Sequence, residues 1–199
     1  MLFRSLDCSP SKIKEYSQKY DYEFWQLRTP LTRYAVSDIP WALDNGCFAE
    51  FRENDWRAML KEARQHPPLW ACAPDMVGDA RRTLDMFNIF YGDMLGVPKA
   101  LVLQDGIGNY EIPWNRISCV FVGGSDDFKI SKEAINACKL AKLLKKWVHV
   151  GRVNTAERAR NWIGIADSID GSGMSRFDAR LEEVLQVIKG DKQHNMELI

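Results

Sequence analysis

In Ala100-Leu101-Val102-Leu103-Gln104-Asp105-Gly106, a short apolar run stops at polar residues and a glycine. A continuous apolar run is typical of a strand in a parallel sheet that is covered on both faces, whereas a half-exposed strand alternates. The same pattern, an apolar run before a polar or glycine cluster, recurs at Trp41–Leu43, Leu69–Ala73, Cys119–Val122, Trp147–Val150 and Ile165–Ile169.

Helical patterns lie between these runs. Apolar residues recur near helical spacing over 10–20, 52–65, 79–91, 131–145, 154–163 and 174–189. Polar residues that cap helices predict starts at Asp79, Ser131 and Asn154. This alternation of strand and helix predicts an α/β protein with a parallel sheet.

The number of strands favours a barrel. Two further strands, at 2–6 and within 23–36, bring the count to eight, which predicts a small (β/α)8 TIM-type barrel in a single domain over 1–199. Because about 200 residues is the lower end for this fold, we expect short loops, and an incomplete barrel stays open. A flavodoxin-like open sheet is the structural alternative.

Composition narrows the class of protein. The 27 basic and 27 acidic residues balance, which disfavours nucleic-acid binding through bulk charge alone. No apolar stretch approaches the length of a membrane span, and residues 1–5 do not read as a signal peptide. Five scattered cysteines without a CxxC pair predict free, mostly buried thiols in a reducing cytoplasm, with neither disulfides nor a zinc site.

Polar residues follow the predicted strands at equivalent positions. In barrels and open α/β sheets the working groups lie just past the carboxyl ends of the strands. An aspartate there also fits a turn or a helix cap, but the repetition favours a shared site. The residues at these ends are Asp44, Asp75, Gln104, Gly123, Gly124, Arg152 and Asp170.

Other motifs are weaker. His149 falls within a predicted strand, a position more typical of a packed core histidine than of a catalytic one. The 3 histidines are too scattered in the sequence to assemble a Ser-His-Asp triad or a metal site. Gly106-Ile107-Gly108 lacks the third glycine of a dinucleotide fingerprint. We therefore expect neither a metal nor an organic cofactor.

The strand ends resemble a known series. Asp44-Asn45-Gly46-Cys47-Phe48 resembles the Asp-Ser-Gly-Gly-Phe segment of tRNA-guanine transglycosylases. The order continues with Asp75, Gln104 and Gly106, Val122-Gly123-Gly124, and Val150-Gly151 before Thr155-Ala156-Glu157. It ends at Ile169-Asp170-Gly171-Ser172-Gly173-Met174-Ser175-Arg176, which is similar to Phe-Asp-Cys-Val-Leu-Pro-Thr-Arg. The resemblance covers 44–176.

The chain departs from the tRNA enzymes in two respects. It is much shorter, and it lacks their zinc site of three cysteines and a histidine, since no cysteine follows Cys138. Both departures resemble the short DpdA-type branch, phage and bacterial relatives that put 7-deazaguanine bases into DNA. The resemblance thus implies DNA rather than tRNA as the polymer, and the host cytoplasm as location if a phage encodes the chain.

The resemblance implies two catalytic carboxylates. Base exchange breaks an N-glycosidic bond at C1′ while the chain stays intact, which a carboxylate nucleophile achieves through a covalent glycosyl intermediate. Asp170 is the implied nucleophile, and Asp44 the implied general acid and base for the departing and arriving bases.

The resemblance also implies how a 7-deazaguanine such as preQ0 is recognised. Asp75 would accept hydrogen bonds from the N1–H and 2-amino edge of the base, and Gln104 with the N–H of Gly123 or Gly124 would bind its O6 side. The Phe48 ring would stack on the base. Arg176 and Arg152 would hold a phosphate or orient the site.

Three alternatives stay open: a tRNA-guanine transglycosylase, an N-glycosidase acting on a nucleoside or base, and a non-catalytic DNA-binding barrel. Direct DNA binding predicts a local basic face at the barrel mouth, because the net charge is zero. Otherwise a partner protein or a homo-oligomer would supply the contact with DNA. The arginines expected to form this face are Arg81, Arg82, Arg152, Arg158 and Arg160.

Overall fold

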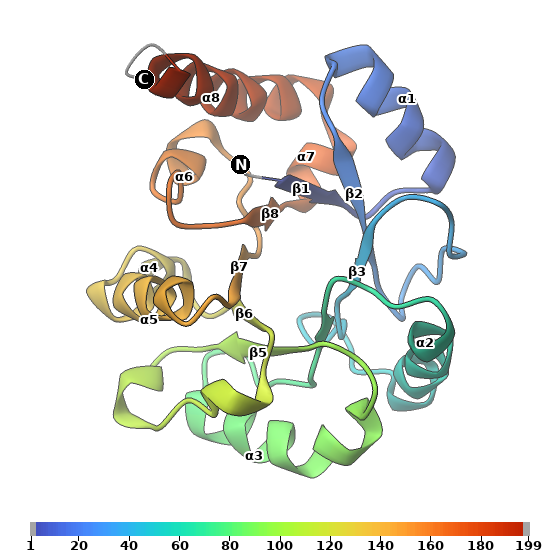
Figure 1. Cartoon of the computed structure of the whole chain (residues 1–199), viewed down its shortest axis with the longest axis vertical. Helices are drawn as coiled ribbons and strands as arrows, with labels where there is room; N and C mark the ends of the chain where they lie inside the picture. The colour runs from blue at the N-terminus through green and yellow to red at the C-terminus, as the bar shows by residue number, and fades with distance from the viewer. Residues whose placement is uncertain (1–2, 197–199) are drawn as a thin grey trace.

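The computed structural model describes residues 3–196, in which parallel strands form one closed barrel in chain order with helices outside it (Figure 1). Pairing of the first and last strands closes the ring and places Ser5 opposite Asp170. The predicted barrel is therefore confirmed and complete, and the open-sheet alternative is wrong. The strands are β1 (Phe3–Leu6), β2 (Phe24–Arg28), β3 (Trp41–Leu43), β4 (Ala71–Cys72), β5 (Lys99–Leu103), β6 (Cys119–Val122), β7 (Trp147–Val150) and β8 (Ser168–Asp170).

An α-helix or a 3₁₀ helix follows each strand except β2, and the helices pack around the barrel. The α-helices are α1 (Pro10–Tyr20), α2 (Glu53–Gln65), α3 (Ala80–Phe90), α4 (Asp126–Lys129), α5 (Lys132–Leu143), α6 (Ala156–Arg160), α7 (Ser172–Arg176) and α8 (Asp178–Met196). Short 3₁₀ helices are η1 (Tyr91–Met94), η2 (Ile107–Asn109) and η3 (Trp114–Arg116). Residues 29–40 join β2 to β3 without a helix, so the expected short loops are not found at this connection.

Two of the predicted helix starts are confirmed and one is wrong. The Asp79 and Ser131 side chains cap α3 and α5 by accepting a backbone N–H three residues on. Thr155, not Asn154, caps α6, because the Asn154 Oδ1 accepts the Gly173 N–H at 2.8 Å instead. The helix predicted over 174–189 is two helices, since Phe177 has extended backbone between α7 and α8.

The hydrophobic core has an outer and an inner part. The outer part lies between strands and helices and includes the fully buried Trp56 and Trp162. The inner part fills the barrel, so that the barrel is a packed core and not a pore. Its residues are Leu27, Ala42, Trp70, Cys72, Ala100, Val102, Cys119 and Phe121.

The burial of the cysteines agrees with the prediction from the sequence. The free thiols are buried at four positions and half-buried at Cys47, which confirms the predicted mostly buried thiols. The buried ones are Cys8, Cys72, Cys119 and Cys138.

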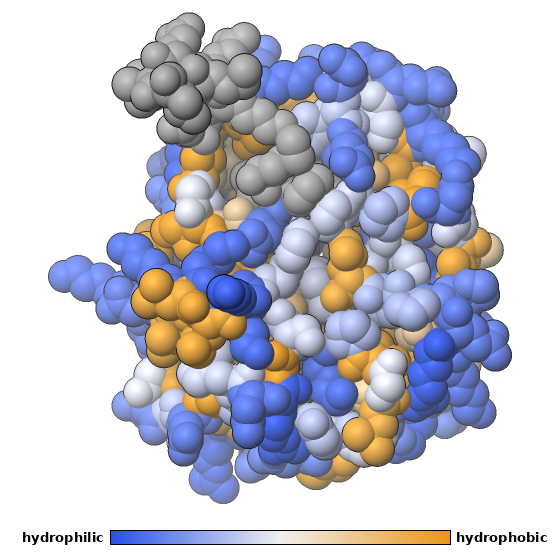
Figure 2. All heavy atoms as spheres, in the orientation of Figure 1, coloured by the Kyte–Doolittle hydropathy of each residue, from blue (hydrophilic) through white to orange (hydrophobic). Residues whose placement is uncertain are grey.

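Figure 2 shows a face covered largely by hydrophilic residues, with hydrophobic ones in separate groups. Within residues 3–196, no helix combines the length and the apolar character needed to cross a membrane.

Candidate active site

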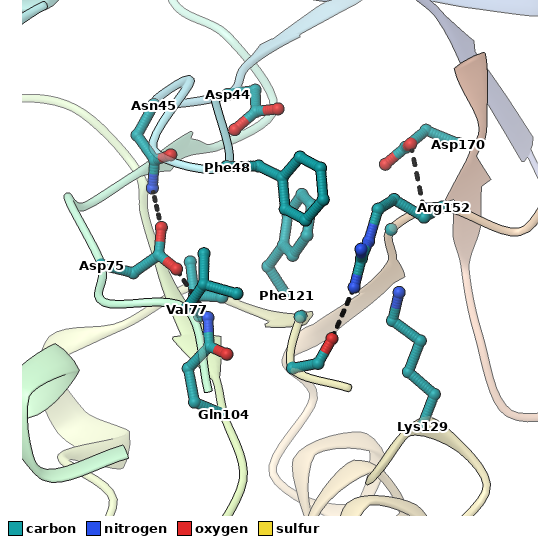
Figure 3. Close-up of a pocket in the computed structure, with 14 residues that line it drawn as sticks. Asp44, Asn45, Phe48, Asp75, Val77, Gln104, Phe121, Lys129, Arg152 and Asp170 are labelled. Carbon is teal, nitrogen blue, oxygen red and sulfur yellow. Dashed lines mark hydrogen bonds between the residues drawn. The ribbon is translucent and has the colours of Figure 1, made fainter. Parts of the chain in front are cut away.

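The carboxyl ends of the strands surround a pocket of about 480 Å³ (Figure 3). Of the residues that the sequence places at a site, all but Arg176 line this pocket. Arg176 lines an adjoining hollow of about 930 Å³. The two spaces share Asp44, Phe48, Arg152 and Asp170. The two spaces therefore adjoin at Asp170 and its three neighbours.

Asp170 is held at both carboxylate oxygens. It is the last residue of β8, and its Oδ1 accepts the Arg152 backbone N–H at 3.1 Å. Its Oδ2 lies 2.8 Å from the Nε2 of His149, a side chain with no exposed surface. The carboxylate thus enters the pocket in a fixed orientation, a condition for attack on a bound substrate.

His149 continues into a buried hydrogen-bond chain that sequence reasoning missed. Its Nδ1 lies 2.7 Å from the Ser168 Oγ, which accepts the Trp147 Nε1–H at 2.8 Å. A carboxylate only accepts hydrogen bonds, so Nε2 carries the proton and a neutral ring accepts the Ser168 hydroxyl at Nδ1. The rings of Trp70 and Phe121 pack on the imidazole at centroid distances of 4.7 and 4.6 Å. His149 is thus a core histidine, as predicted, that also positions Asp170.

Asp44 follows β3 and faces the same pocket. Its Oδ1 accepts the Gly46 N–H at 3.3 Å, in a turn for which Gly46 supplies a φ of +77°. Burial, together with the negative charge of Asp170, raises the pKa of Asp44 to about 7. A carboxyl with this pKa both gives and takes a proton near neutral pH, which is the requirement for general acid–base catalysis.

Asp75 receives hydrogen bonds from two amide side chains. Asn45 Nδ2 donates to Oδ1 at 2.7 Å, and Gln104 Nε2 donates to Oδ2 at 2.5 Å. Gln104 is itself oriented by the Gly78 N–H, which donates to its Oε1 at 2.9 Å. Burial raises the pKa of Asp75, although these hydrogen bonds oppose the rise. The pocket thus contains a rigid acceptor backed by amides, and the sequence had not indicated that Gln104 donates to Asp75.

Glycines give the pocket its space. A Cβ on Gly123 would come within 2.7 Å of Val102 and 2.9 Å of the Gln104 amide nitrogen. A Cβ on Gly151 would come within 2.6 Å of the Phe121 ring. These approaches are closer than any side chain tolerates, so only glycine lets the backbone border the pocket here.

Phe48 and Arg152 stand at the mouth. The Phe48 side chain is 66% exposed, and the Arg152 guanidinium lies 4.3 Å from the centre of its ring. Arg152 also donates to the Gly124 carbonyl at 2.6 Å. Its φ of 59° is left-handed, a conformation that costs a residue with a side chain about 1–2 kcal/mol.

The predicted basic face is only partly formed. Arg152 lines the pocket, but Arg81 and Arg82 lie at the start of α3, with carboxylates of Asp85 and Asp79 at 3.9 and 3.7 Å. Arg158, in α6, pairs with Asp126 at 2.5 Å, and Arg160 ends that helix. Acidic partners therefore offset three of these arginines.

Comparisons of sequence find no relative: no protein-family model and no curated protein matches the chain. Solved structures do match it. A chain of the tryptophan synthase α2β2 complex from the hyperthermophile Pyrococcus furiosus is similar, with a TM-score of 0.55 and 13% identity over 93% of this chain and 97% of that chain. The fold is a TIM barrel.

A second match comes from the Amycolatopsis orientalis BexX/CysO complex, with a TM-score of 0.53 and 9% identity over 95% of this chain and 88% of that chain. At such low identities the likeness shows the fold alone. The TIM barrel serves enzymes of many unrelated reactions, so the reaction has to be argued from the pocket.

Lys129 is a pocket residue that sequence reasoning missed. It ends α4, is 5% exposed, and its Nζ has no hydrogen-bond partner among the described residues. Burial, with a further contribution from the Arg152 charge, lowers the pKa of the ammonium to about 8. The sequence carried no signal for this position beyond a lysine shortly after the Gly123-Gly124 pair.

Replacing Lys129 by Met is expected to stabilise the TIM barrel near pH 7, because an unpaired ammonium leaves the interior. The pKa shift corresponds to a gain on the order of 3 kcal/mol. Below pH 8 the buried ammonium is charged and destabilises the fold, and the penalty disappears as pH rises from about 8 to 10.5, where the unfolded lysine titrates. Urea unfolding of the wild type and K129M at pH 7 and pH 10 measures this, and an equal difference at the two pH values would contradict it.

Proposed function

We propose that this protein is a guanine transglycosylase that exchanges guanine in DNA for a 7-deazaguanine base through a covalent Asp170 intermediate. The observation that carries the proposal is the presence, in one pocket, of an oriented carboxylate (Asp170), a carboxyl with a pKa of about 7 (Asp44) and an amide-backed acceptor (Asp75). The resemblance of the strand ends to tRNA-guanine transglycosylases supports the same assignment.

The base would lie with its N1–H and 2-amino edge against Asp75. That edge of guanine has only donors, and Asp75 offers carboxylate oxygens already oriented by Asn45 and Gln104. The O6 acceptor then faces Gly124, because the Gly123 N–H already donates to the Leu103 carbonyl at 3.0 Å. The exposed Phe48 ring is available for stacking.

The reaction would proceed in two displacements. Asp170 attacks C1′, the bond from C1′ to N9 breaks, and the departing guanine takes its proton from Asp44. The incoming base then loses its N9 proton to Asp44 and displaces Asp170 from C1′. The two inversions give net retention, and Asp44 ends in its initial protonation state. No redox step or cofactor is needed.

DNA is the proposed polymer, in keeping with the resemblance of the chain to the DpdA-type branch, which puts 7-deazaguanine bases into DNA. A guanine in duplex DNA has to leave the stack, at a cost of a few kcal/mol. Phosphate contacts would come from Arg152 and from Arg176 in the adjoining hollow. Because the arginines around them are mostly paired, a partner protein or a second copy of the chain is a further proposed source of contact with DNA.

Release of labelled guanine from DNA tests this function. With 7-cyano-7-deazaguanine (preQ0) present, we expect release and stoichiometric incorporation of the added base. Release of many guanines per enzyme without an added base would instead identify an N-glycosidase, since the exchange allows one guanine per enzyme in that case. Release only from tRNA would identify a tRNA transglycosylase. DNA binding without release from either polymer would identify a non-catalytic barrel and contradict the proposal.

A further inference from the structure

Lys129 is the feature of the pocket that the proposed exchange does not yet use. Its ammonium is nine-tenths buried, unpartnered among the described residues, and lines the same pocket as Asp75 and Asp170. Figure 3 shows its side chain beside that of Arg152, with the amino group at the pocket. A buried cation without a partner is costly, so its presence in a binding pocket points to a ligand that supplies the missing acceptor.

The charges around Lys129 favour an acceptor that carries negative charge. Arg152 and Arg158 act on it as positive charges, and Asp170 and Asp126 as negative ones. None of these carboxylates hydrogen-bonds to the Lys129 amino group: Asp170 is engaged by His149 and Arg152, and Asp126 by Arg158. Lys129 and Arg152 therefore present two cations to whatever enters between them.

The order of the strands shows which part of the base would meet Lys129. Around the mouth, Asp75 follows β4, Gln104 follows β5, Gly123 follows β6, and Asp170 ends β8. Around the base, the 2-amino group and N1 are followed by O6, then position 7, then N9, which carries the sugar. With N1 at Asp75 and N9 at Asp170, O6 lies toward β5 and β6 and position 7 lies after β6, where Lys129 is.

We propose that Lys129 reads the substituent at position 7 of the incoming base, and that this substituent is a hydrogen-bond acceptor, best a carboxylate. The inference rests on the proposed function and adds the class of base. A 7-carboxylate pairs with the ammonium, a 7-carboxamide or 7-nitrile accepts one hydrogen bond from it, and a protonated 7-aminomethyl group is repelled by it and by Arg152.

Calorimetric binding of free bases to the full chain tests this without requiring turnover. The probes are guanine and its 7-deaza analogues with carboxyl, cyano and aminomethyl groups at position 7. We expect the carboxyl base to bind at least about tenfold more tightly than the aminomethyl base, as a charge-assisted hydrogen bond predicts. K129M should abolish that preference, whereas K129Q, which keeps a neutral donor, should retain affinity for the cyano base and lose it for the carboxyl base.

One control variant and the pattern of binding separate the possible failures. K132M changes an exposed lysine three residues away and should leave all affinities unchanged. Equal binding of the carboxyl and aminomethyl bases, or a preference that survives in K129M, would overturn the role of Lys129 while leaving base exchange standing. If none of the bases binds, guanine included, the proposed function fails and this inference with it.

Discussion

Replacing Asp170 by Asn is expected to reduce base exchange by about 10³-fold or more, because an amide does not form the glycosyl ester on which the exchange depends. The fold should be retained. When the oxygen of the new amide faces the Arg152 N–H, that hydrogen bond is kept, and the NH₂ group of the amide then faces His149. The imidazole adapts by moving its proton to Nδ1, from which it donates to Ser168.

The rate of guanine release from DNA by D170N and by the wild type measures this effect. The midpoint of denaturant unfolding shows whether D170N is folded. D85N is the matched control, since Asp85 is an exposed aspartate of α3 away from the pocket. It should exchange bases at the wild-type rate. A D170N protein that folds and still releases guanine within tenfold of the wild-type rate would remove Asp170 as the nucleophile.

Replacing Asp44 by Asn should slow guanine release by about 10²–10⁴-fold, the usual contribution of a positioned proton donor. The pH profile carries the sharper signature. With a pKa raised to about 7, Asp44 is protonated below neutral pH. The first displacement in the wild type should therefore slow as pH rises through 7, and D44N should lose this dependence.

The substitution of Asp44 by Asn is also expected to increase stability at neutral pH. The pKa of Asp44 is higher in the folded chain than its ordinary value of 3.8, so the folded state binds the proton more tightly. The free energy of unfolding of the wild type therefore falls as pH rises from about 4 to 7, and that of D44N does not fall for this reason. Denaturant unfolding should show D44N gaining stability relative to the wild type between pH 4 and pH 8. A constant difference, with an unchanged pH–rate profile, would mean that Asp44 does not titrate in this range.

The barrel could be predicted because its strands are buried on both faces. Cys119–Val122 and Trp147–Val150 are strands over the same residues as the apolar runs, since each run ends where the chain leaves the core. A strand that is buried on both faces can be recognised from the local sequence, because it is a nearly continuous apolar run. Closure of the ring depends instead on pairing between β1 and β8, far apart in the chain, and for that reason the sequence left a complete barrel open.

The location of the candidate site was equally predictable, but its hydrogen bonds were not. Polar residues that end successive parallel strands necessarily share one edge, so Asp44, Asp75 and Asp170 had to lie near one another. The contact of His149 with Asp170 depends on register. His149 lies opposite Ser168 in the β7–β8 pair, and the alternation of faces along a strand then points His149 and Asp170 into the same barrel interior.

Lys129 shows where local reasoning fails. A lysine in a short charged segment, Asp126-Asp127-Phe128-Lys129, is normally solvated. Here Ser125 caps a four-residue helix and Phe128 anchors it in the core, which carries the lysine into the pocket. Only the three-dimensional arrangement reveals the unpaired ammonium.

The covalent Asp170 intermediate can be detected by intact mass spectrometry of the protein after incubation with guanine-containing DNA in the absence of an added base. We expect a covalent protein–DNA adduct, which proteolysis of the denatured sample maps to the peptide that contains Asp170. The adduct should disappear when the incoming base is added, and it should not form in D170N. A wild-type protein that releases guanine with no adduct, or an adduct that maps elsewhere, would contradict this expectation.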